Sequence, residues 1–192
     1  MINIVLFGPP GSGKGTQAQN LIETFNLKQI STGDLFRYNI KNATELGTLA
    51  KSYMDKGELV PDQVTIDMLI DELKKTTDSN GFIFDGFPRT SHQALVLDQI
   101  VKDQLGADIS ICLSLIVEDE ILVQRLVKRG ETSGRTDDSD ENIIRNRIKE
   151  YYAKTAEVAE LYKQQGKYVE VNGVGEIPEI SEKLFAEVQK FL

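Results

Sequence analysis

The chain has few of the residues from which disulfides and zinc sites are built. Its 192 residues include one cysteine, Cys112, and one histidine, His92. A disulfide within the chain needs two cysteines, and a structural zinc site needs several Cys or His ligands, so the sequence excludes both. Cys112 lies within the apolar stretch 109–117, which indicates a buried strand residue and not a nucleophile. We expect His92 to lie at the surface without a catalytic role.

Long apolar runs and an excess of positive charge are also missing. No run of about 18 apolar residues occurs, so we expect no membrane-spanning helix. The first apolar stretch follows no basic segment, and we interpret it as a core strand and not as a signal peptide. The formal net charge of −8 disfavours an extended surface for nucleic acid or anionic membrane, although a nucleotide needs only a local group of cations. These features predict an intracellular, cytoplasmic protein.

A glycine-rich turn near the N-terminus is the strongest signal in the sequence. The apolar residues Ile2–Phe7 lead into Gly8-Pro-Pro-Gly-Ser-Gly-Lys14, which fits the pattern G-x-x-x-x-G-K. The general pattern has Ser or Thr directly after the lysine, whereas here Gly15 comes first and Thr16 follows. After Thr16 the apolar residues take the spacing of one helix face. Backbone N–H groups, a helix N-terminus and Lys14 then converge, which predicts a site for the phosphates of a nucleoside triphosphate.

Apolar stretches that read as strands alternate with segments of helical spacing along the whole chain. We predict strands at 2–7, 27–31, 81–85, 108–117 and 167–171. Helices are predicted after Thr16, from Thr32, within 42–60, from Pro61, after Thr90, over 119–129, from Asp140 and around 180–188, with a polar loop at 130–138. This alternation is typical of an α/β domain with a mostly parallel sheet and helices on both faces. Ligands bind such folds at the carboxyl ends of the strands.

Asp85 and the arginines supply the charges that a phosphate site needs. Asp85 ends an apolar strand as a Walker-B acid does, and we expect it to hold Mg²⁺, directly or through water, rather than to cap the next helix. Guanidinium groups bind phosphate through two hydrogen bonds and stay charged in a closed site. Five of the seven arginines lie between residues 125 and 147. The seven are Arg37, Arg89, Arg125, Arg129, Arg135, Arg145 and Arg147.

No side chain stands out as a catalytic base. A hydroxyl acceptor would need such a base, whereas a phosphate acceptor is already largely deprotonated at pH 7 because its second pKa is about 6. The sequence therefore favours transfer of a phosphoryl group onto another phosphate, with catalysis by positioning and by neutralisation of charge.

Four segments resemble the signatures of the adenylate kinase family. They are residues 8–16, 31–37, 85–90 together with Gln93, and 134–138, and they occur in the family's order over the length of the chain. The resemblance implies a P-loop NTPase-type parallel sheet of five strands in the order 2-3-1-4-5 and the reaction ATP + AMP ⇌ 2 ADP with Mg²⁺. It also implies a monomer with a single core over 1–192, a monophosphate-binding insertion at 31–60 and a short lid loop at 130–138 without zinc. With so short a lid, we expect the 31–60 segment to make the larger movement.

The resemblance also assigns roles to residues that match the family's motifs. For ATP these are Gly11, Ser12, Gly13, Lys14, Gly15, Thr16, Arg125, Arg129 and Gly175, with Mg²⁺ near Thr16 and Asp85. For AMP they are Thr32, Arg37, Glu58, Leu59, Val60, Gly86, Phe87, Pro88, Arg89, Gln93, Arg135 and Arg147. The residues expected to act on the transferring phosphates, and so to be catalytic, are Lys14, Arg89, Arg125, Arg135 and Arg147. The segment 137–147 looks one residue longer than in many relatives, so Arg145 stays open as an alternative to Arg147.

Two other functions stay open on the sequence alone. A UMP/CMP kinase shares the phosphate-binding residues, but such enzymes tend to have Ala at the position of Thr32 and Asn near the Gly-Phe-Pro-Arg turn. Thr32 and Gln93 favour adenine instead, because an amide can pair with the edge of that base. A GTPase-type binding switch would use Asp78-Ser-Asn-Gly81 as its D-x-x-G motif. That stretch precedes a strand and does not end one, and no Asn-Lys-x-Asp occurs to read guanine.

Overall fold

The computed structural model describes residues 1–75, 79–138 and 140–192, and this part of the chain contains a five-stranded parallel sheet. The strands are β1 (Ile2–Phe7), β2 (Lys28–Ser31), β3 (Gly81–Asp85), β4 (Ile111–Ile116) and β5 (Tyr168–Asn172). They lie in the order β2-β3-β1-β4-β5, and every neighbouring pair is parallel. The predicted α/β fold and strand order are confirmed. Asp78, which begins the D-x-x-G stretch, lies outside the described residues.

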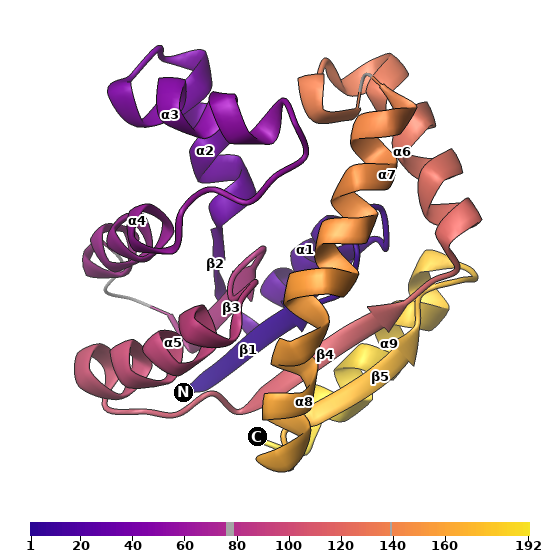
Figure 1. Ribbon diagram of the computed structural model, residues 1–192. Coiled ribbons are helices and arrows are strands. Elements are labelled where there is room, and N and C mark those ends of the chain that lie inside the picture. Colours follow the sequence, from indigo (N-terminus) through magenta and orange to yellow (C-terminus); the bar gives the residue numbers. More distant parts are fainter. Residues whose placement is uncertain (76–78, 139) are drawn as a thin grey trace.

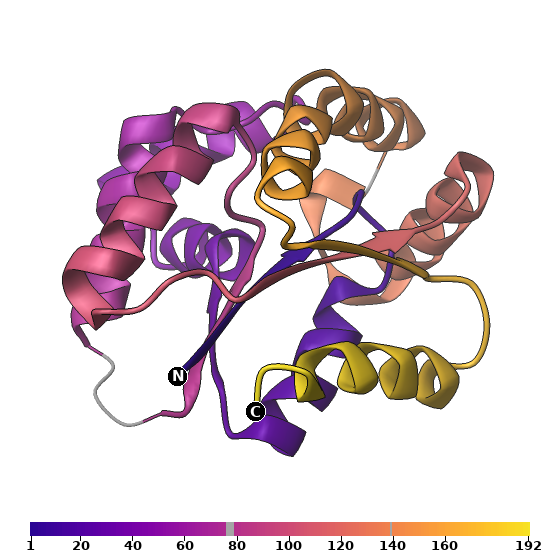
Figure 2. The ribbon, with the colours of Figure 1, turned by 90° about the horizontal axis from the view of Figure 1, so that it is seen from below.

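Helices cover both faces of this sheet, as Figures 1 and 2 show. On one face lie α1 (Lys14–Phe25) and α9 (Ile177–Gln189). On the other lie α4 (Asp62–Lys74), α5 (Ser91–Leu105) and α8 (Ala156–Gln164). No helix within the described ranges is both long and apolar enough to cross a membrane.

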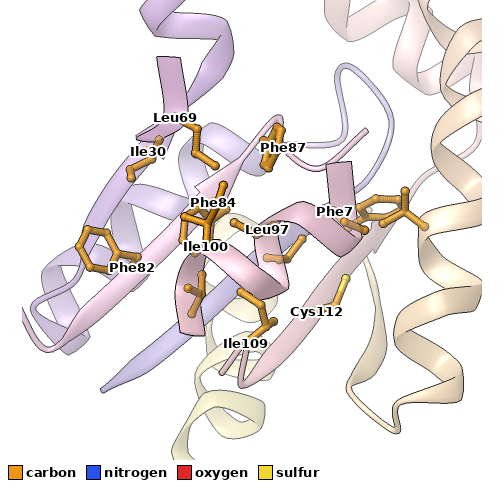
Figure 3. Packing of buried hydrophobic residues seen from close by; sticks show 14 of the residues in the cluster. Phe7, Ile30, Leu69, Phe82, Phe84, Phe87, Leu97, Ile100, Ile109 and Cys112 are labelled. Carbon is orange, nitrogen blue, oxygen red and sulfur yellow. The ribbon is translucent and has the colours of Figure 1, made fainter. Parts of the chain in front are cut away.

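Alternate residues of β1 belong to two separate apolar cores, one on each face of the sheet. Ile4 and Leu6 pack in the cluster beneath α1 and α9, whereas Val5 and Phe7 pack in the cluster beneath α4, α5 and α8. Figure 3 shows the second of these clusters, in which Cys112 of β4 is fully buried. The predicted position of Cys112 as a buried strand residue is therefore confirmed, and its burial raises the pKa of its thiol.

The remaining helices extend beyond the carboxyl edge of the sheet in two groups. Helices α2 (Thr32–Lys41) and α3 (Glu45–Met54) form the first, and α6 (Asp119–Ser133) and α7 (Glu141–Glu150) form the second (Figure 1). The first group has an apolar cluster around Phe36, Ala50 and Val60, which side chains of α4 also contact. Gly47 lets the two helices approach closely, because a Cβ there would lie 2.2 Å from the carbonyl oxygen of Asn39.

The stretch 130–138 differs from the loop that we predicted, since most of it is helical. Helix α6 continues to Ser133 and ends at Gly134, which has a left-handed φ of 64°, and Thr136–Asp138 forms a 3₁₀ turn. The close approach of the turn to the helix depends on Gly130, where a Cβ would lie 2.3 Å from the carbonyl oxygen of Asp138. The long helix predicted from Asp140 is also divided, because a π-helical turn, Tyr151–Thr155, separates α7 from α8.

Candidate active site

A cavity of about 500 Å³ lies at the carboxyl edge of the sheet, between the two groups of helices. It is lined by the loops after β1, β2 and β3 together with residues of α6 and α7. The predicted site residues among its lining are Gly11, Gly13, Lys14, Gly15, Thr16, Thr32, Arg37, Glu58, Leu59, Val60, Asp85, Gly86, Phe87, Pro88, Arg89, Gln93, Arg125, Arg129, Arg135 and Arg147. The structure thus brings into one cavity residues that lie more than a hundred positions apart in the sequence.

Three of the predicted or alternative site residues lie outside this lining. Ser12 is a buried residue of the glycine-rich turn, and Gly175 lies exposed in the loop after β5. Arg145, the alternative to Arg147, points away: it is paired with Glu120 at 3.0 Å and Glu141 at 2.8 Å on the outer surface of α6 and α7. Of the two arginines it is therefore Arg147 that faces the cavity.

The glycine-rich turn folds around the ammonium group of Lys14. Gly8, Gly11 and Gly13 all have positive φ angles, of 137°, 84° and 98°, which side chains with a Cβ rarely adopt. Lys14 Nζ donates hydrogen bonds to the carbonyl oxygens of Gly8 (2.7 Å) and Pro9 (3.0 Å). Burial, opposed by the charge of Asp85 and assisted by that of Arg89, lowers the pKa of Lys14 to about 8. An anion in the cavity would relieve this unfavourable burial of charge.

Arg89 is fixed by the turn that follows β3. Its Nε donates to the carbonyl oxygen of Gly86 (2.7 Å), and the same oxygen accepts a hydrogen bond from Thr32 Oγ1 (2.9 Å). Its backbone carbonyl accepts from Thr155 Oγ1 (2.9 Å). Burial, with the nearby charge of Arg147, lowers the pKa of Arg89 to about 10. The guanidinium group is therefore held at one place before any ligand arrives.

Two buried aspartates hold Arg129 and Arg147, and the sequence motifs assigned neither of them a role. Asp138 accepts two hydrogen bonds from Arg129, at 2.6 and 3.0 Å, and one from Arg147 at 2.5 Å. Asp137 is paired with Arg147 at 3.1 Å. Burial alone would raise the pKa of Asp138, but the hydrogen bonds from Arg129 and the charge of Arg147 outweigh it, so the pKa lies below its usual value.

The 31–60 segment contacts the α6–α7 side across the mouth of the cavity. Arg135 lies 3.8 Å from Asp34, which is also paired with Arg37. Thr136 Oγ1 bonds Asp55 Oδ1 at 3.3 Å, and Asn146 Nδ2 donates to the carbonyl oxygen of Lys56 at 2.7 Å. The structure is therefore a closed arrangement, in which polar contacts join the two sides of the cavity.

The charges around the cavity suit two phosphate chains. Six arginines and Lys14 line it, against five carboxylates from Asp34, Glu58, Asp85, Asp137 and Glu150. In the part of the chain that the structure describes, no group of three or more His, Cys, Asp or Glu side chains is placed to hold a metal ion. The hydroxyl of Thr16 and the carboxylate of Asp85 are nevertheless hard oxygen ligands at the cavity wall, which fits a Mg²⁺ ion that arrives with a nucleotide's phosphates.

Comparison with known proteins decides the family. The family profile described as adenylate kinase matches residues 6–167. The adenylate kinase of Flavobacterium psychrophilum is 58% identical over 186 residues, with 96% of each chain covered, and that of Flavobacterium johnsoniae is 55% identical over 184 residues with the same coverage. The adenylate kinase of Phocaeicola vulgatus is 46% identical over 190 residues, covering 99% of this chain and all of the relative.

The chain belongs to the adenylate kinase family. It is a nucleoside monophosphate phosphotransferase that converts ATP and AMP into two ADP. The predicted family and reaction are thus confirmed, and neither the UMP/CMP kinase nor the GTPase-type switch is needed to account for the sequence. The wall of this adenylate kinase cavity also contains Met54, Glu150, Tyr151 and Thr155, which the motifs did not predict. A helical spacing through 150–155 was the signal available for the last three, since Arg147 is one turn before Glu150 and Tyr151 and two turns before Thr155.

Proposed function

We propose that ATP and AMP bind at opposite ends of this cavity and that a phosphoryl group passes between them at its centre. The observation that carries the proposal is that one cavity is lined both by the glycine-rich turn after β1 and by the 31–60 segment. A single enclosed space then positions donor and acceptor together, which replaces an encounter in solution by a reaction within one complex.

The ATP end is proposed at the N-terminus of α1. Residues 11–16 would surround the β- and γ-phosphates with backbone N–H groups, and Lys14 would exchange its two carbonyl partners for phosphate oxygens. Arg125, which donates to the carbonyl of Gly173 at 3.1 Å, and Arg129 would lie on the same side. We retain Ser12 as a backbone donor in this loop and Gly175 as a contact to the adenine.

The AMP end is proposed beneath α2 and α3. Thr32, Arg37, residues 58–60, residues 86–89 and Gln93 would hold the monophosphate, its ribose and its base. Arg89 and Arg37 would bind the acceptor phosphate through paired hydrogen bonds. Gln93 is 2% exposed, and its amide would read the base edge.

Catalysis is proposed to rest on positioning and on neutralisation of charge. Lys14, Arg89, Arg125, Arg135 and Arg147 would contact the transferring phosphates, where negative charge must be shared between donor and acceptor. Thr16 and Asp85 would hold Mg²⁺, directly or through water, and the ion would supply positive charge that neutralises the phosphates. Closure of the 31–60 segment against Arg135 and Thr136 would exclude water, which could otherwise accept the phosphoryl group.

The domain assignments belong to the same proposal. The chain is a single core over 1–192 with a monophosphate-binding insertion at 31–60, and 130–138 acts as a short lid without metal. We also propose that the enzyme works as a monomer in the cytoplasm. Sedimentation of the purified chain at the mass of a single copy, with and without nucleotides, tests the first of these, and a stable dimer would contradict it.

The decisive test of the site allocation is the variant Gln93→Leu. Because the leucine cannot hydrogen-bond a base, we expect the KM for AMP to rise by about tenfold or more and the KM for ATP to change little. Rates of ADP formation are measured with AMP, UMP, CMP and GMP as acceptors, and His92→Ala, an exposed neighbour on α5, serves as the control. If the KM for ATP rose more than the KM for AMP, the ATP and AMP ends of the cavity would have been assigned the wrong way round. A preference of the wild type for UMP or CMP would overturn the adenine assignment.

A further inference from the structure

Asp62, the first residue of α4, lies directly behind Gln93. Its Oδ1 accepts a hydrogen bond from Gln93 Nε2 at 2.8 Å, and its Oδ2 accepts one from Thr90 Oγ1 at 2.8 Å. The Thr90 hydroxyl in turn accepts from the backbone N–H of Gln93 (3.2 Å) and caps α5. Asp62 is partly buried and is not among the described residues that line the cavity. It touches the proposed base-reading residue from the side away from the ligand.

The contacts of Gln93 permit one orientation of its amide group. Gln93 Oε1 accepts a hydrogen bond from the backbone N–H of Arg89 at 2.7 Å, while Nε2 donates to the carboxylate of Asp62. A backbone N–H can only donate and an ionised carboxylate can only accept. If the amide turned over, its nitrogen would face the N–H of Arg89 and its oxygen would face the carboxylate, so two favourable contacts would become two repulsive ones.

The nitrogen and the oxygen of this amide can each make one further hydrogen bond, to a ligand. The nitrogen has a second hydrogen and the oxygen has a second lone pair, and Gln93 lines the cavity. The amide therefore offers one donor and one acceptor whose order in space is set by Asp62 and Arg89. A base fits only if its own acceptor and donor stand in the complementary order.

We propose that Asp62 is a positioning residue that determines which purine the monophosphate site accepts. The inference rests on the proposed AMP site. Adenine presents an amino donor at C6 beside the acceptor N1, whereas hypoxanthine presents an oxygen acceptor at C6 beside an N1–H donor. The two bases have nearly the same shape but the opposite order of donor and acceptor. A fixed amide selects between them, and an amide free to turn over accepts both.

The variant Asp62→Asn tests this proposal with inosine monophosphate as the competing acceptor. Asparagine has nearly the same volume but can donate as well as accept, so it pairs with either orientation of Gln93 and leaves only the N–H of Arg89 to oppose rotation. We expect the ratio of kcat/KM for AMP to that for inosine monophosphate to fall about tenfold, with the KM for ATP unchanged. This ratio is measured on one preparation, so it does not depend on the folded fraction of the variant.

Asp67→Asn is the matched control, because Asp67 lies on the same helix and also accepts from a glutamine, Gln63 Nε2, at 2.8 Å, but on the exposed side. We expect wild-type selectivity in this variant. The second comparison is made in a Gln93→Ala background. If Asp62 acts through Gln93, then Asp62→Asn changes the AMP-to-inosine ratio in the parent and not in that background.

The outcomes separate the two proposals. If Gln93→Ala abolishes the preference for AMP while Asp62→Asn leaves it intact, the AMP site stands and the role of Asp62 is wrong. An equal effect of Asp62→Asn with and without Gln93, or the same loss in Asp67→Asn, would also overturn it. If Gln93→Ala leaves the preference unchanged, the base is read elsewhere and both proposals are wrong.

Discussion

Among single residues, Lys14 combines a full positive charge with burial among backbone carbonyls. Its two hydrogen bonds to Gly8 and Pro9 compensate only part of the hydration that the ammonium group loses. The lowered pKa of about 8 measures that deficit. The same deficit makes the residue a strong partner for phosphate, because the ligand restores a counter-charge where the protein lacks one.

Lys14→Met should reduce kcat for ADP formation by at least about 100-fold, a loss of several kcal/mol of transition-state stabilisation. The methionine keeps the length of the side chain and removes its charge. Lys28→Met, at an exposed position at the start of β2, is the control and should retain full activity. Near-normal turnover by Lys14→Met would contradict the assignment of the glycine-rich turn to the active site.

The free energy of unfolding should depend on pH in a way that reflects the lowered pKa of Lys14. Its pKa is about 8 in the folded protein and 10.5 when exposed, so between these values the unfolded chain binds more protons than the folded one. Stability from this group therefore rises with pH from about 8 to 10.5, and below pH 8 the cost of burying the charge is fully present. Urea unfolding of nucleotide-free protein is measured at about pH 7.5 and about pH 9.5. The difference in unfolding free energy between wild type and Lys14→Met should shift in favour of the wild type at the higher pH. A gap independent of pH would contradict the burial of a charged Lys14.

At the scale of elements, α6 shows how one glycine positions two arginines. Gly130 allows the turn Thr136–Asp138 to pack against the helix, and that turn holds Asp138 beside Arg129 and Arg147. The contact is between backbone and backbone, so a side chain at position 130 cannot simply rotate away. The geometry of the two arginines thus depends on a residue that contacts neither of them through a side chain.

Gly130→Ala should lower both stability and activity. Overpacking of this kind costs about 1–3 kcal/mol, which we expect as a lower midpoint of thermal unfolding. Displacement of Asp138 should also reduce kcat about tenfold or more, because the arginines lose their orientation. Thr132→Ala, an exposed change in the same turn of helix, provides the comparison and should behave like wild type. If Gly130→Ala lost stability but kept its kcat, Asp138 would not position the arginines.

Sequence patterns predicted the elements well where apolar runs have clear boundaries. Strands β1 and β3 begin and end where expected, because glycine or charge follows each apolar run. Strand β4 is shorter than predicted, and side-chain hydrogen bonds join the residues before it to Asn3 of the neighbouring strand β1. Helix α6 is longer than predicted, because its polar last turn gave no apolar spacing to follow.

The cavity residues also divide into those that sequence motifs predict and those whose partners are set only by the folded structure. The glycine-rich turn and Gln93 stand in recognisable motifs, and the structure places them at the cavity. The contacts of Asp62 with Gln93 and of Asp138 with Arg147 join positions 31 and 9 residues apart on different elements. The periodicity of the sequence cannot predict such partners, because they depend on the packing of α4 against α5 and of the 3₁₀ turn against α7.

For the whole molecule, the 31–60 segment is attached to the core but has its own apolar cluster. Phe36, Ala50 and Val60 pack with one another and not within the two clusters that flank the sheet. Polar contacts join this segment to the α6–α7 side. A unit whose small apolar cluster meets the rest of the molecule mainly at α4, and which is closed by exposed polar contacts, can move as a body at low cost.

A reversible cross-link between Asp55→Cys and Thr136→Cys should stop turnover. These side chains meet at 3.3 Å in the closed arrangement, and Cys112 is buried and will not compete for oxidant. We expect oxidation to trap the closed form and abolish ADP formation, and reduction to restore it, because products leave only after opening. Each single cysteine variant is the control. Full activity of the oxidised double variant would show that the 31–60 segment need not open, as would superposable structures with and without a bisubstrate inhibitor.

The separate cluster around Phe36, Ala50 and Val60 also bears on how the enzyme fails under heat. A small core exposes its apolar surface for less energy than the large cores beside the sheet, so α2 and α3 should loosen first on warming. Heat would then abolish the activity of the enzyme while its sheet is still folded, and cooling would restore that activity. We therefore expect inactivation by mild heat to be a local and reversible melting that precedes unfolding of the sheet.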